Sequence, residues 1–317
     1  GGMCGSSSTS IPPDAVRVPT LTPMRTRLLT YFALLAAIFA VTALSACGSD
    51  DSSSGGGDTV QFDLQKAAEA TKAKGSAEMS LKFSGKDDKQ SATFEMTGKA
   101  DFKNAKVDAQ VDLASVLAAA GVPAQGDQTV RLLVDGKKLW AKLPSVQGIA
   151  LPGGQDWVSL DLQALIDEFG LKEQADKAQS EPMKPIEMSK VGTETLNGAE
   201  VTHLKAESTL RDLLNGLPDD QRKQAIDQLE KQKDGKKALD TKVPAEVWVD
   251  DSNALHRMTA KISDDETDVS IDLTFKNFGT EVTIDPPADS EVFNVTELLK
   301  QAAKGFGESL GGSGKTS

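Results

Sequence analysis

The strongest constraint on the fold is a strict alternation of apolar and polar residues in several separate segments. In AEMSLKF, from Ala77 to Phe83, every second side chain is apolar and those between are polar. The alternation recurs in ATFEM, KVDAQVDL and DVSIDLTF, which end at Met96, Leu113 and Phe275. Because side chains alternate between the two faces of a strand, this pattern predicts strands with one buried face and one wet face. Such sheets are typically antiparallel.

Turn signals between these segments favour hairpins. A DG dipeptide at 135–136 separates TVRLLV from KKLWAKL, and an NG dipeptide at 197–198 separates VGTETL from AEVTHLKAE. Both dipeptides are typical of type I′ turns, in which two successive residues need positive φ. SG at 84–85 and DSN at 251–253 indicate two looser hairpin connections. The sequence therefore predicts an antiparallel meander.

Helical spacing is found in fewer segments, and these interrupt the strands rather than alternate with them. Residues 63–74 and 161–179 carry apolar residues at helical intervals, and residues 296–310 are expected to form a C-terminal helix. No internal repeat is evident. This order of elements favours an α+β fold.

Two further helices are predicted around Pro218. Four leucines between 210 and 217 form an apolar stripe that ends at this proline. The next helix is expected to begin at residue 219 or 220, both aspartates, which can cap it. Ile226 and Leu229 give it only a thin apolar face. We therefore expect this helix to lie on the surface.

The N-terminal segment has the features of membrane targeting. Arg25 and Arg27 precede an apolar run without charge from Leu28 to Ala46. Such a run fits a cleaved signal peptide or a retained transmembrane helix, since about 18 apolar residues can span a bilayer. The small residues just before Cys47 favour cleavage.

The residues Leu44, Ser45, Ala46 and Cys47 resemble the lipobox of bacterial lipoproteins. The resemblance implies cleavage before Cys47 and lipid attachment, by fatty acids such as palmitate, to its thiol and its new amino group. Two acyl chains hold a protein on a membrane stably, whereas one holds it only marginally. We therefore interpret residues 24–46 as a lipoprotein signal peptide. Residues 47–58, rich in Gly, Ser and Asp, are expected to be a flexible tether.

The remaining segments give the expected domain organisation. Residues 1–23 are rich in Ser, Thr and Pro and precede the positive region, so we interpret them as an extension that is either not native or disordered, with Met24 as the true start. Residues 59–310 are expected to form a single domain and residues 311–317 a disordered tail. The expected location is the extracytoplasmic face of the bacterial cell membrane, with a lipid anchor.

Composition excludes several classes of function. The chain of 317 residues contains two cysteines, Cys4 and Cys47, which are too few for a disulfide framework or a thiolate metal cluster. Its net charge of −12 has the wrong sign for binding to a phosphate backbone. We therefore expect no nucleic acid as a partner, and no cofactor or metal.

A family resemblance rests on two long segments. The late run VPAEVWVDDSNALHRM … VSIDLTFKNFGTEVTIDPP and the hairpin VGTETLNGAEVTHLKAE, together with the lipobox, tether and meander, resemble the LppX/LprG-type (LppX/LprAFG) lipoproteins of actinobacteria. These are related to the LolA/LolB-like lipid carriers. The resemblance covers roughly residues 60–299. It implies a strongly curved antiparallel sheet, or half-barrel, with helices packed on its concave face and a hydrophobic cavity for acyl chains of a lipid or glycolipid.

Strand parity supplies the expected lining of that cavity. The inward apolar set comprises Met79, Leu81, Phe83, Phe94, Met96, Leu132, Val134, Val247, Val249, Ile271 and Leu273. The expected function is that of a membrane-anchored lipoprotein that binds lipid or glycolipid acyl chains and carries them across the cell envelope. A transporter of the envelope is a further candidate partner.

An alternative function stays open at this point. Helices alone, or helices together with a ligand, can cover an apolar sheet face. If helices alone cover the sheet, the chain would be a tethered interaction or scaffold protein of the cell envelope with a fully packed core and no ligand.

Catalytic motifs are weak, so we expect no enzyme. GGSGKT at 311–316 lacks the first glycine of a P-loop and a preceding strand. His203 and His256 are the only two histidines, and neither lies in a hydrolase or metalloprotease motif. By parity with Val201, His203 is predicted to be a satisfied core histidine, and His256, beside a turn, is predicted to be solvated.

Two other features are interpreted as surface features. The acidic turns at 250–251 and 264–266 do not match an EF-hand loop, so solvated charges are favoured over a calcium site. Trp248 shares strand parity with Glu246 and Asp250. It is therefore predicted to be a half-covered surface aromatic.

Overall fold

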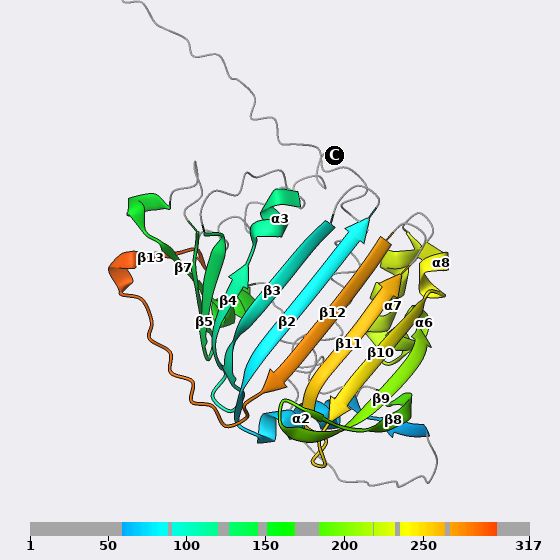
Figure 1. The fold of residues 1–317 in the computed structure, drawn as a ribbon. Helices are drawn as coiled ribbons and strands as arrows, with labels where there is room; N and C mark the ends of the chain where they lie inside the picture. The colour runs from blue at the N-terminus through cyan, green and yellow to red at the C-terminus, as the bar shows by residue number, and fades with distance from the viewer. Residues whose placement is uncertain are drawn as a thin grey trace, which may run out of the picture.

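The computed structural model describes residues 59–87, 91–119, 127–144, 151–168, 184–217, 219–231, 235–263 and 267–296. These residues form one large sheet with short helices against it (Figure 1). No helix among them is both long and apolar enough to cross a bilayer. The expectations for residues 1–58 and 297–317, which include the lipobox and most of the C-terminal helix, lie outside the described residues.

The sheet contains thirteen strands and is almost entirely antiparallel. The strands are β1 (Thr59–Phe62), β2 (Ser76–Asp87), β3 (Ser91–Asp101), β4 (Lys106–Asp112), β5 (Thr129–Asp135), β6 (Lys138–Lys142), β7 (Trp157–Asp161), β8 (Ile186–Leu196), β9 (Ala199–Thr209), β10 (Lys242–Val249), β11 (Leu255–Ser263), β12 (Thr267–Lys276) and β13 (Val292–Asn294). Their order is β1-β8-β9-β10-β11-β12-β2-β3-β4-β5-β6-β7-β13, and the pair β7–β13 is parallel. The predicted antiparallel sheet is confirmed.

The described helices are short. They are α2 (Leu64–Ala73), α3 (Ala114–Ala119), α4 (Leu162–Glu168), α6 (Leu210–Asn215), α7 (Asp219–Glu230) and α8 (Gly235–Leu239), with 3₁₀ turns at Pro152–Gly154 and Asp289–Glu291. Asp63 caps α2 as a carboxylate does at a helix start, since its Oδ1 accepts the Lys66 N–H at 3.0 Å. The helices predicted at 63–74 and after Pro218 are confirmed, and residues 169–179 lie outside the described part.

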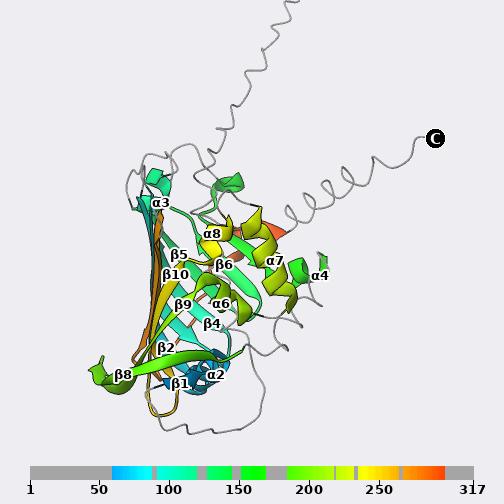
Figure 2. The same ribbon diagram turned by 90° about the vertical axis from the view of Figure 1, so that its right-hand side faces the viewer.

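Strand pairing separates an apolar face from a polar face. Leu81 pairs with Met96 on one side and Leu273 on the other, while the next residue, Lys82, pairs with Glu95 and Asp272. Helices α2, α6, α7 and α8 pack on the face that carries Leu81, which we call the helix-covered face. Figure 2 shows α6, α7 and α8 together on one side of the strands.

Two buried clusters fill part of the helix-covered face. The α6–α8 cluster contains Phe83, Leu210, Leu214, Leu217, Leu229, Ala238, Leu239, Val243, Ala260, Ile262, Val269 and Ile271. The α2 cluster contains Phe62, Leu64, Ala67, Met188, Leu204, Ala206, Val247, Val249, Leu255, Met258 and Leu273. Leu229 of α7 is 1% exposed, but most other described side chains of this helix are exposed or half-buried, so α7 lies on the surface with a thin apolar face, as expected. One leucine in the correct position anchors an otherwise polar helix.

The sheet bends sharply between β3 and β4 at Gly98. A Cβ atom on Gly98 would lie 2.3 Å from the Asp108 carbonyl oxygen and 2.5 Å from the Ala109 Cα. Only glycine permits this approach, and a glycine inside a strand often marks a tight bend. The neighbouring side chains on this face, Ala77 and Ala100, are small and buried. Figure 1 shows β4 and β5 turned away from the plane of β2 and β3, as this bend requires.

The predicted type I′ turns have different outcomes. Leu196 pairs with Ala199, and Asn197 and Gly198 have φ of 52° and 84°. The type I′ turn predicted at 197–198 is therefore confirmed. Asp135 pairs with Lys138, so the other loop is 136–137, and only Gly136 in it has positive φ. The type I′ prediction is wrong there, because the strand extends one residue further than the dipeptide suggests.

The looser hairpins also have different outcomes. Residues 251–253 lie between β10 and β11, which are paired, so that hairpin is confirmed. Ser84 and Gly85 instead lie inside β2, paired with β3 on one side and β12 on the other. The hairpin predicted there is wrong, because pairing on both sides overrides the weak turn preference of a Ser-Gly dipeptide.

Candidate functional site

The helix-covered face continues past the two clusters onto β3, β4, β5 and β6. The register rows Gly98–Ala109–Leu132–Ala141 and Ala100–Val107–Val134–Leu139 carry it across these strands. Val111 and Val130 of this face are buried, whereas six of its other side chains are only half-buried: Met79, Met96, Val107, Leu132, Val134 and Leu139. In the part of the chain that the structure describes, none of them belongs to a buried cluster. We call these six residues the open apolar patch.

The predicted cavity lining shares one face by register but divides into two groups. Phe83, Val247, Val249, Ile271 and Leu273 are buried in the two clusters, and Leu81 and Phe94 pack against them. Met79, Met96, Leu132 and Val134 belong to the open apolar patch. The lining of a lipid cavity by these residues stays a prediction.

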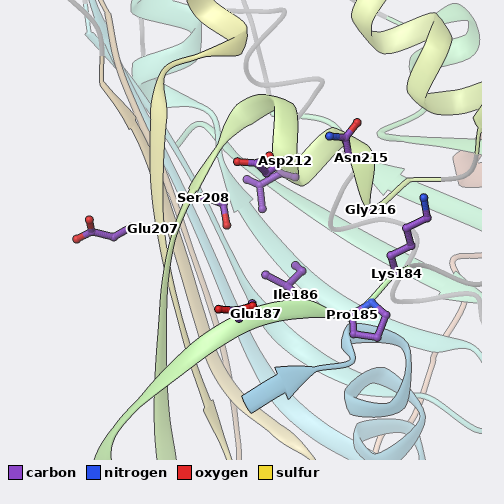
Figure 3. A pocket seen from close by; sticks show the side chains of 10 residues that line it. Lys184, Pro185, Ile186, Glu187, Glu207, Ser208, Asp212, Asn215 and Gly216 are labelled. Carbon is purple, nitrogen blue, oxygen red and sulfur yellow. The ribbon is translucent and has the colours of Figure 1, made fainter. Parts of the chain in front are cut away.

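A pocket of about 400 Å³ lies between the start of β8, the end of β9 and α6 (Figure 3). Ile186, which packs against the α2 cluster, and Leu213, which packs against the α6–α8 cluster, both line it. The pocket therefore lies at the boundary between the two clusters. Its other lining residues are Lys184, Pro185, Glu187, Glu207, Ser208, Asp212, Asn215 and Gly216.

Hydrogen bonds at both ends hold α6, the helix that lines one side of this pocket. Thr209 and Asp212 form a capping box at the start of α6, with the Thr209 N–H donating to Asp212 Oδ2 at 3.0 Å. The hydrogen bonds from Thr209 lower the pKa of Asp212. At the other end, the Gly216 carbonyl accepts the Lys184 N–H at 3.2 Å. Hydrogen bonds thus connect one end of α6 to the end of β9 and the other to the residues just before β8. These bonds fix the position of α6 beside the pocket.

On the opposite face, charged residues surround Trp248. Its ring stacks on His203 with centroids 4.4 Å apart, the Arg257 guanidinium lies 5.0 Å from its centroid, and its Nε1 donates to Glu194. His203 Nε2 lies 2.8 Å from a Glu246 carboxylate oxygen. Trp248 is 7% exposed, so the prediction of a half-covered aromatic is wrong. Side chains of the neighbouring strands cover it.

His203 is satisfied, but its predicted place in the apolar core is wrong. It lies opposite Trp248 on the polar face, and its side chain is 17% exposed. Besides Glu246, its Nδ1 lies 3.6 Å from Glu194. Arg257, on the next strand but one, forms a two-pronged ion pair with Asp272, which raises the pKa of the arginine. Mutual pairing of this kind is typical of a structural ion network.

His256 is buried, so the prediction that it is solvated is wrong. It is 4% exposed, its Nε2 lies 3.3 Å from Asp250 Oδ2, and its ring packs edge-on against Phe278 with centroids 5.0 Å apart. Its Nδ1 is buried and has no hydrogen-bond partner among the described residues. No local pattern in the sequence indicates this burial, because Phe278 comes from the segment that follows β12.

Asp250 joins the β10–β11 hairpin to α2. Its Oδ1 accepts the N–H groups of Ser252 and Ala254, and its Oδ2 lies 2.9 Å from Lys74 Nζ at the end of α2. Burial raises the pKa of Asp250, but hydrogen bonds from Ser252, Lys74, His256 and Ala254 outweigh it and hold the pKa far below its ordinary value. The prediction of a solvated charge is therefore wrong for Asp250, because its carboxylate is bonded to protein donors.

No arrangement suited to a metal ion is present in the described ranges, where no group of three or more His, Cys, Asp or Glu side chains could hold one. The acidic turn at 264–266 lies outside those ranges. The candidate site comprises the open apolar patch and, beside α6, a pocket that both polar and apolar residues line.

Sequence reasoning missed a small core on the opposite face. Leu133, Trp140 and Trp157 are buried there, with Ile284 and Val292 of the C-terminal segment packed against them. The consecutive apolar residues in TVRLLV were the available signal, since a strand that is apolar on both faces is covered on both. The pocket beside α6 was also missed, because the residues that line it are distant in sequence.

No family model and no curated protein matches the chain. Among solved structures it is similar to the lipoprotein LppX of Mycobacterium tuberculosis, with 16% identity and a TM-score of 0.39 over 70% of this chain and 96% of that one. It is also similar to LprF from Mycobacterium bovis, with 16% identity and a TM-score of 0.33 over 71% and 94%. An outer membrane lipoprotein-sorting protein domain from Vibrio parahaemolyticus gives 14% and 0.22 over 69% and 94%.

Lipoproteins of the type that the sequence resembles are thus among the structural neighbours of this chain. These TM-scores are below 0.5. The proposals below therefore rest on the residues of this chain.

Proposed function

We propose that this protein binds the acyl chains of a lipid or glycolipid between the helix-covered face and its helices. The observation that supports this is the change in burial along one apolar face. Apolar residues of the same parity are buried where helices α2 and α6–α8 pack, whereas the open apolar patch over β2 to β6 is half-buried, with Val111 and Val130 buried beside it. An apolar patch that a protein does not cover itself is a place for an apolar ligand.

The bend at Gly98 makes such a site more effective. We infer that the close approach of β3 and β4 at Gly98 turns the open apolar patch inward, on the same side as the helices. A lipid chain there would contact apolar side chains from several strands. Each methylene group that leaves water contributes about 0.8 kcal/mol, so even a partial chain gains several kcal/mol.

Membrane anchoring is the second part of the proposal. Acylated Cys47 would hold the domain at the extracytoplasmic face of the membrane, and residues 48–58 would give it reach. A tethered carrier can exchange lipid with a membrane or an envelope transporter without leaving the surface. A site that takes acyl chains out of water would suit carriage across the cell envelope rather than catalysis.

The alternative, a packed scaffold without ligand, has one observation in its favour. Leu210, Leu214 and Leu239 are 0% exposed, so the α6–α8 cluster by itself resembles an ordinary protein core. The two functions make different predictions only for the open apolar patch. A scaffold leaves it empty, and a carrier fills it.

Mass spectrometry of non-covalently bound lipid tests the two functions. The full-length protein is purified from membranes in a mild, non-lipid detergent and extracted with organic solvent. We expect about one lipid for each protein molecule, enriched over the bulk lipid of the same membranes. Extracts whose lipid composition matches the bulk membrane, at well below one lipid per protein, would instead favour the scaffold.

The anchor is tested separately with Cys47→Ala. We expect this variant to lack the diacylglyceryl mass on the intact protein and to stay unprocessed at the lipoprotein site. Cys4→Ala is the matched control, because it removes the other cysteine and leaves the lipobox intact. Normal acylation of Cys47→Ala would overturn the anchoring proposal.

A further inference from the structure

The apolar face that carries the open apolar patch continues to the edge of the sheet at β13. Leu160 of β7 pairs with Leu139 of the patch, so Leu160 and Val158 lie on the helix-covered face. Phe293 of β13 pairs with Val158 and lies on the same face. All three of these added side chains are half-buried. Partly covered apolar surface thus extends from the patch to the outermost strand (Figure 1).

The chain leaves the sheet at this edge and begins a helix there. Thr296, which follows β13, is helical and only 3% exposed. Its Oγ1 accepts the Asp161 N–H at 2.9 Å, and its own N–H donates to Asn294 Oδ1 at 2.9 Å. Asp161 directly follows Leu160 on β7. Hydrogen bonds therefore fix the start of the next segment beside the patch.

The next segment, residues 297–310, has the sequence ELLKQAAKGFGESL. At helical spacing its charged residues fall on one side and its apolar residues on the other. A helix of this length by itself is marginal in water, so its apolar side needs a surface to pack on. The apolar residues are Leu298, Leu299, Ala302, Ala303, Phe306 and Leu310.

The open apolar patch matches this segment in position and extent. As a helix, residues 297–310 would be about 21 Å long, at about 1.5 Å per residue. Neighbouring strands lie about 4.8 Å apart, so this length reaches from β7 across β6, β5 and β4 to β3. Those strands carry all of the patch except Met79 of β2. The apolar side of the helix can therefore cover most of the patch.

We propose that residues 297–310 form an amphipathic helix that packs on the open apolar patch in the absence of lipid and that lipid displaces. This proposal rests on the proposed lipid-binding function and adds a cover to the same site. Gly305 and Gly307 weaken a helix, because glycine loses more backbone freedom than other residues. The cover is thus held weakly enough to open. When it is closed, it keeps the patch of the empty protein out of water.

Photocrosslinking from Phe306 tests where the segment lies. Phe306→p-benzoylphenylalanine exchanges one apolar ring for a photoreactive one in the full-length protein, and mass spectrometry identifies the crosslinked peptides. In the delipidated protein we expect intramolecular crosslinks to β3, β4 or β5. Lys304→p-benzoylphenylalanine is the matched control, because Lys304 is on the charged side, and it should give several-fold fewer. Crosslinks only to other surfaces, or only between two molecules, would overturn the proposal.

Addition of lipid then tests displacement. Dioleoylglycerol, delivered from cyclodextrin, should reduce the crosslinks from Phe306 several-fold as it binds. If it binds and the crosslinks stay undiminished, the proposed function stands and displacement is overturned. If crosslinks to the patch form but no lipid binds or copurifies, the carrier function itself is rejected and the segment is a fixed part of the core.

The affinity for lipid gives a second measurement that needs no photochemistry. A ligand that binds only the open form binds more tightly when that form is more populated. Leu299→Ser combined with Phe306→Ser should weaken the cover and lower the Kd for dioleoylglycerol about five-fold. Lys300→Ser combined with Lys304→Ser changes the charged side of the same segment and should leave the Kd unchanged. Equal Kd values for the two double variants would overturn the proposal.

Discussion

Two parts of the helix-covered face have the same strand parity and similar side chains but different packing. Over β10, β11 and β12, Val243, Val247 and Ile271 are buried beneath α2 and α6–α8. Over β4, β5 and β6, Val107, Val134 and Leu139 are half-buried. Since the side chains are alike, the difference comes from their cover. The first part has the packing of a protein core, and the second is an apolar surface that is only partly covered.

The comparison also shows how one sheet can serve both purposes. Helices α2 and α6–α8 lie on one side of the bend at Gly98, where β12 pairs with β2 over ten residues and β2 pairs with β3 over eleven. On the other side β5, β6 and β7 are shorter, at 7, 5 and 5 residues. The packed part can hold the bend in place, and under the proposed function the open apolar patch would bind and release lipid.

The largest expected effect is the loss of a leucine from the packed part. Leu214 is 0% exposed and lies in the α6–α8 cluster, so Leu214→Ala should lower the free energy of unfolding by about 3–4 kcal/mol. Leu132→Ala, in the open apolar patch, should lower it by only about 1–2 kcal/mol, because less surface leaves the core. Urea unfolding measures both. Equal losses would mean that the two parts are packed alike.

The bend between the two parts should tolerate no side chain. Gly98→Ala would place a Cβ within 2.3 Å of the backbone of β4, so we expect a loss of about 3 kcal/mol in the free energy of unfolding. Gly192→Ala is the control, because an added Cβ there meets nothing within 4 Å. Thermal unfolding compares the two variants. A neutral Gly98→Ala would show that β3 and β4 do not need their close approach.

The alternation of residues predicted the apolar face correctly but not how deeply each residue is buried. Val134 and Val247 carry the same signal in sequence, but Val247 lies in the α2 cluster, whereas Val134, within the described residues, lies in none of the buried clusters. Similarly, parity placed Trp248 on the polar face, but its burial depends on His203 and Arg257 from other strands. Such cover is a long-range property that local patterns do not contain.

Local turn signals failed in another way, because they predicted a turn at a position where pairing with other strands forms a continuous strand. The dipeptide at 84–85 resembles a hairpin turn, but β2 continues through it because β3 and β12 pair on both of its edges. Gly98, the residue that bends the sheet, had no distinctive neighbours in sequence. Its role follows only from the distance to β4.

The attachment of α2 to the packed part should depend on pH. The pKa of Asp250 is held below its ordinary value, so this carboxylate stabilises the fold fully above the unfolded pKa of about 3.9. That stability is lost progressively as the pH falls below this value toward the folded pKa. Asp250→Asn should lower the free energy of unfolding by about 2 kcal/mol at pH 7 and by less at pH 3, where part of the contribution of this carboxylate has been lost.

Asp251→Asn is the control for this prediction, because Asp251 is exposed in the same turn. It should change stability little at either pH. The measurement is urea unfolding of both variants and the unmodified protein at pH 7 and pH 3. An effect of Asp250→Asn that is equal at the two pH values would show that the charge of this carboxylate does not matter.

The smallest expected effect on stability, and the sharpest on function, comes from filling the open apolar patch. Val134→Trp adds a large side chain where Val134 is half-buried and faces Val107 and Leu139 across the strands. If the space is a lipid site, the indole takes the place of lipid, so the delipidated variant should lose less than about 1 kcal/mol while bound lipid falls several-fold. In a packed core, the same change would cause overpacking that typically costs about 1–3 kcal/mol.

Two other valines calibrate this result. Val191 is 57% exposed at the bulge of β8, so Val191→Trp should change neither lipid content nor melting temperature. Val243 is 0% exposed in the α6–α8 cluster, so Val243→Trp should lower the melting temperature clearly. Val134→Trp should resemble Val191→Trp in stability but not in lipid content. If it instead resembles Val243→Trp, and lipid is never found in the unmodified protein, the open apolar patch is part of a closed core and the carrier function is rejected.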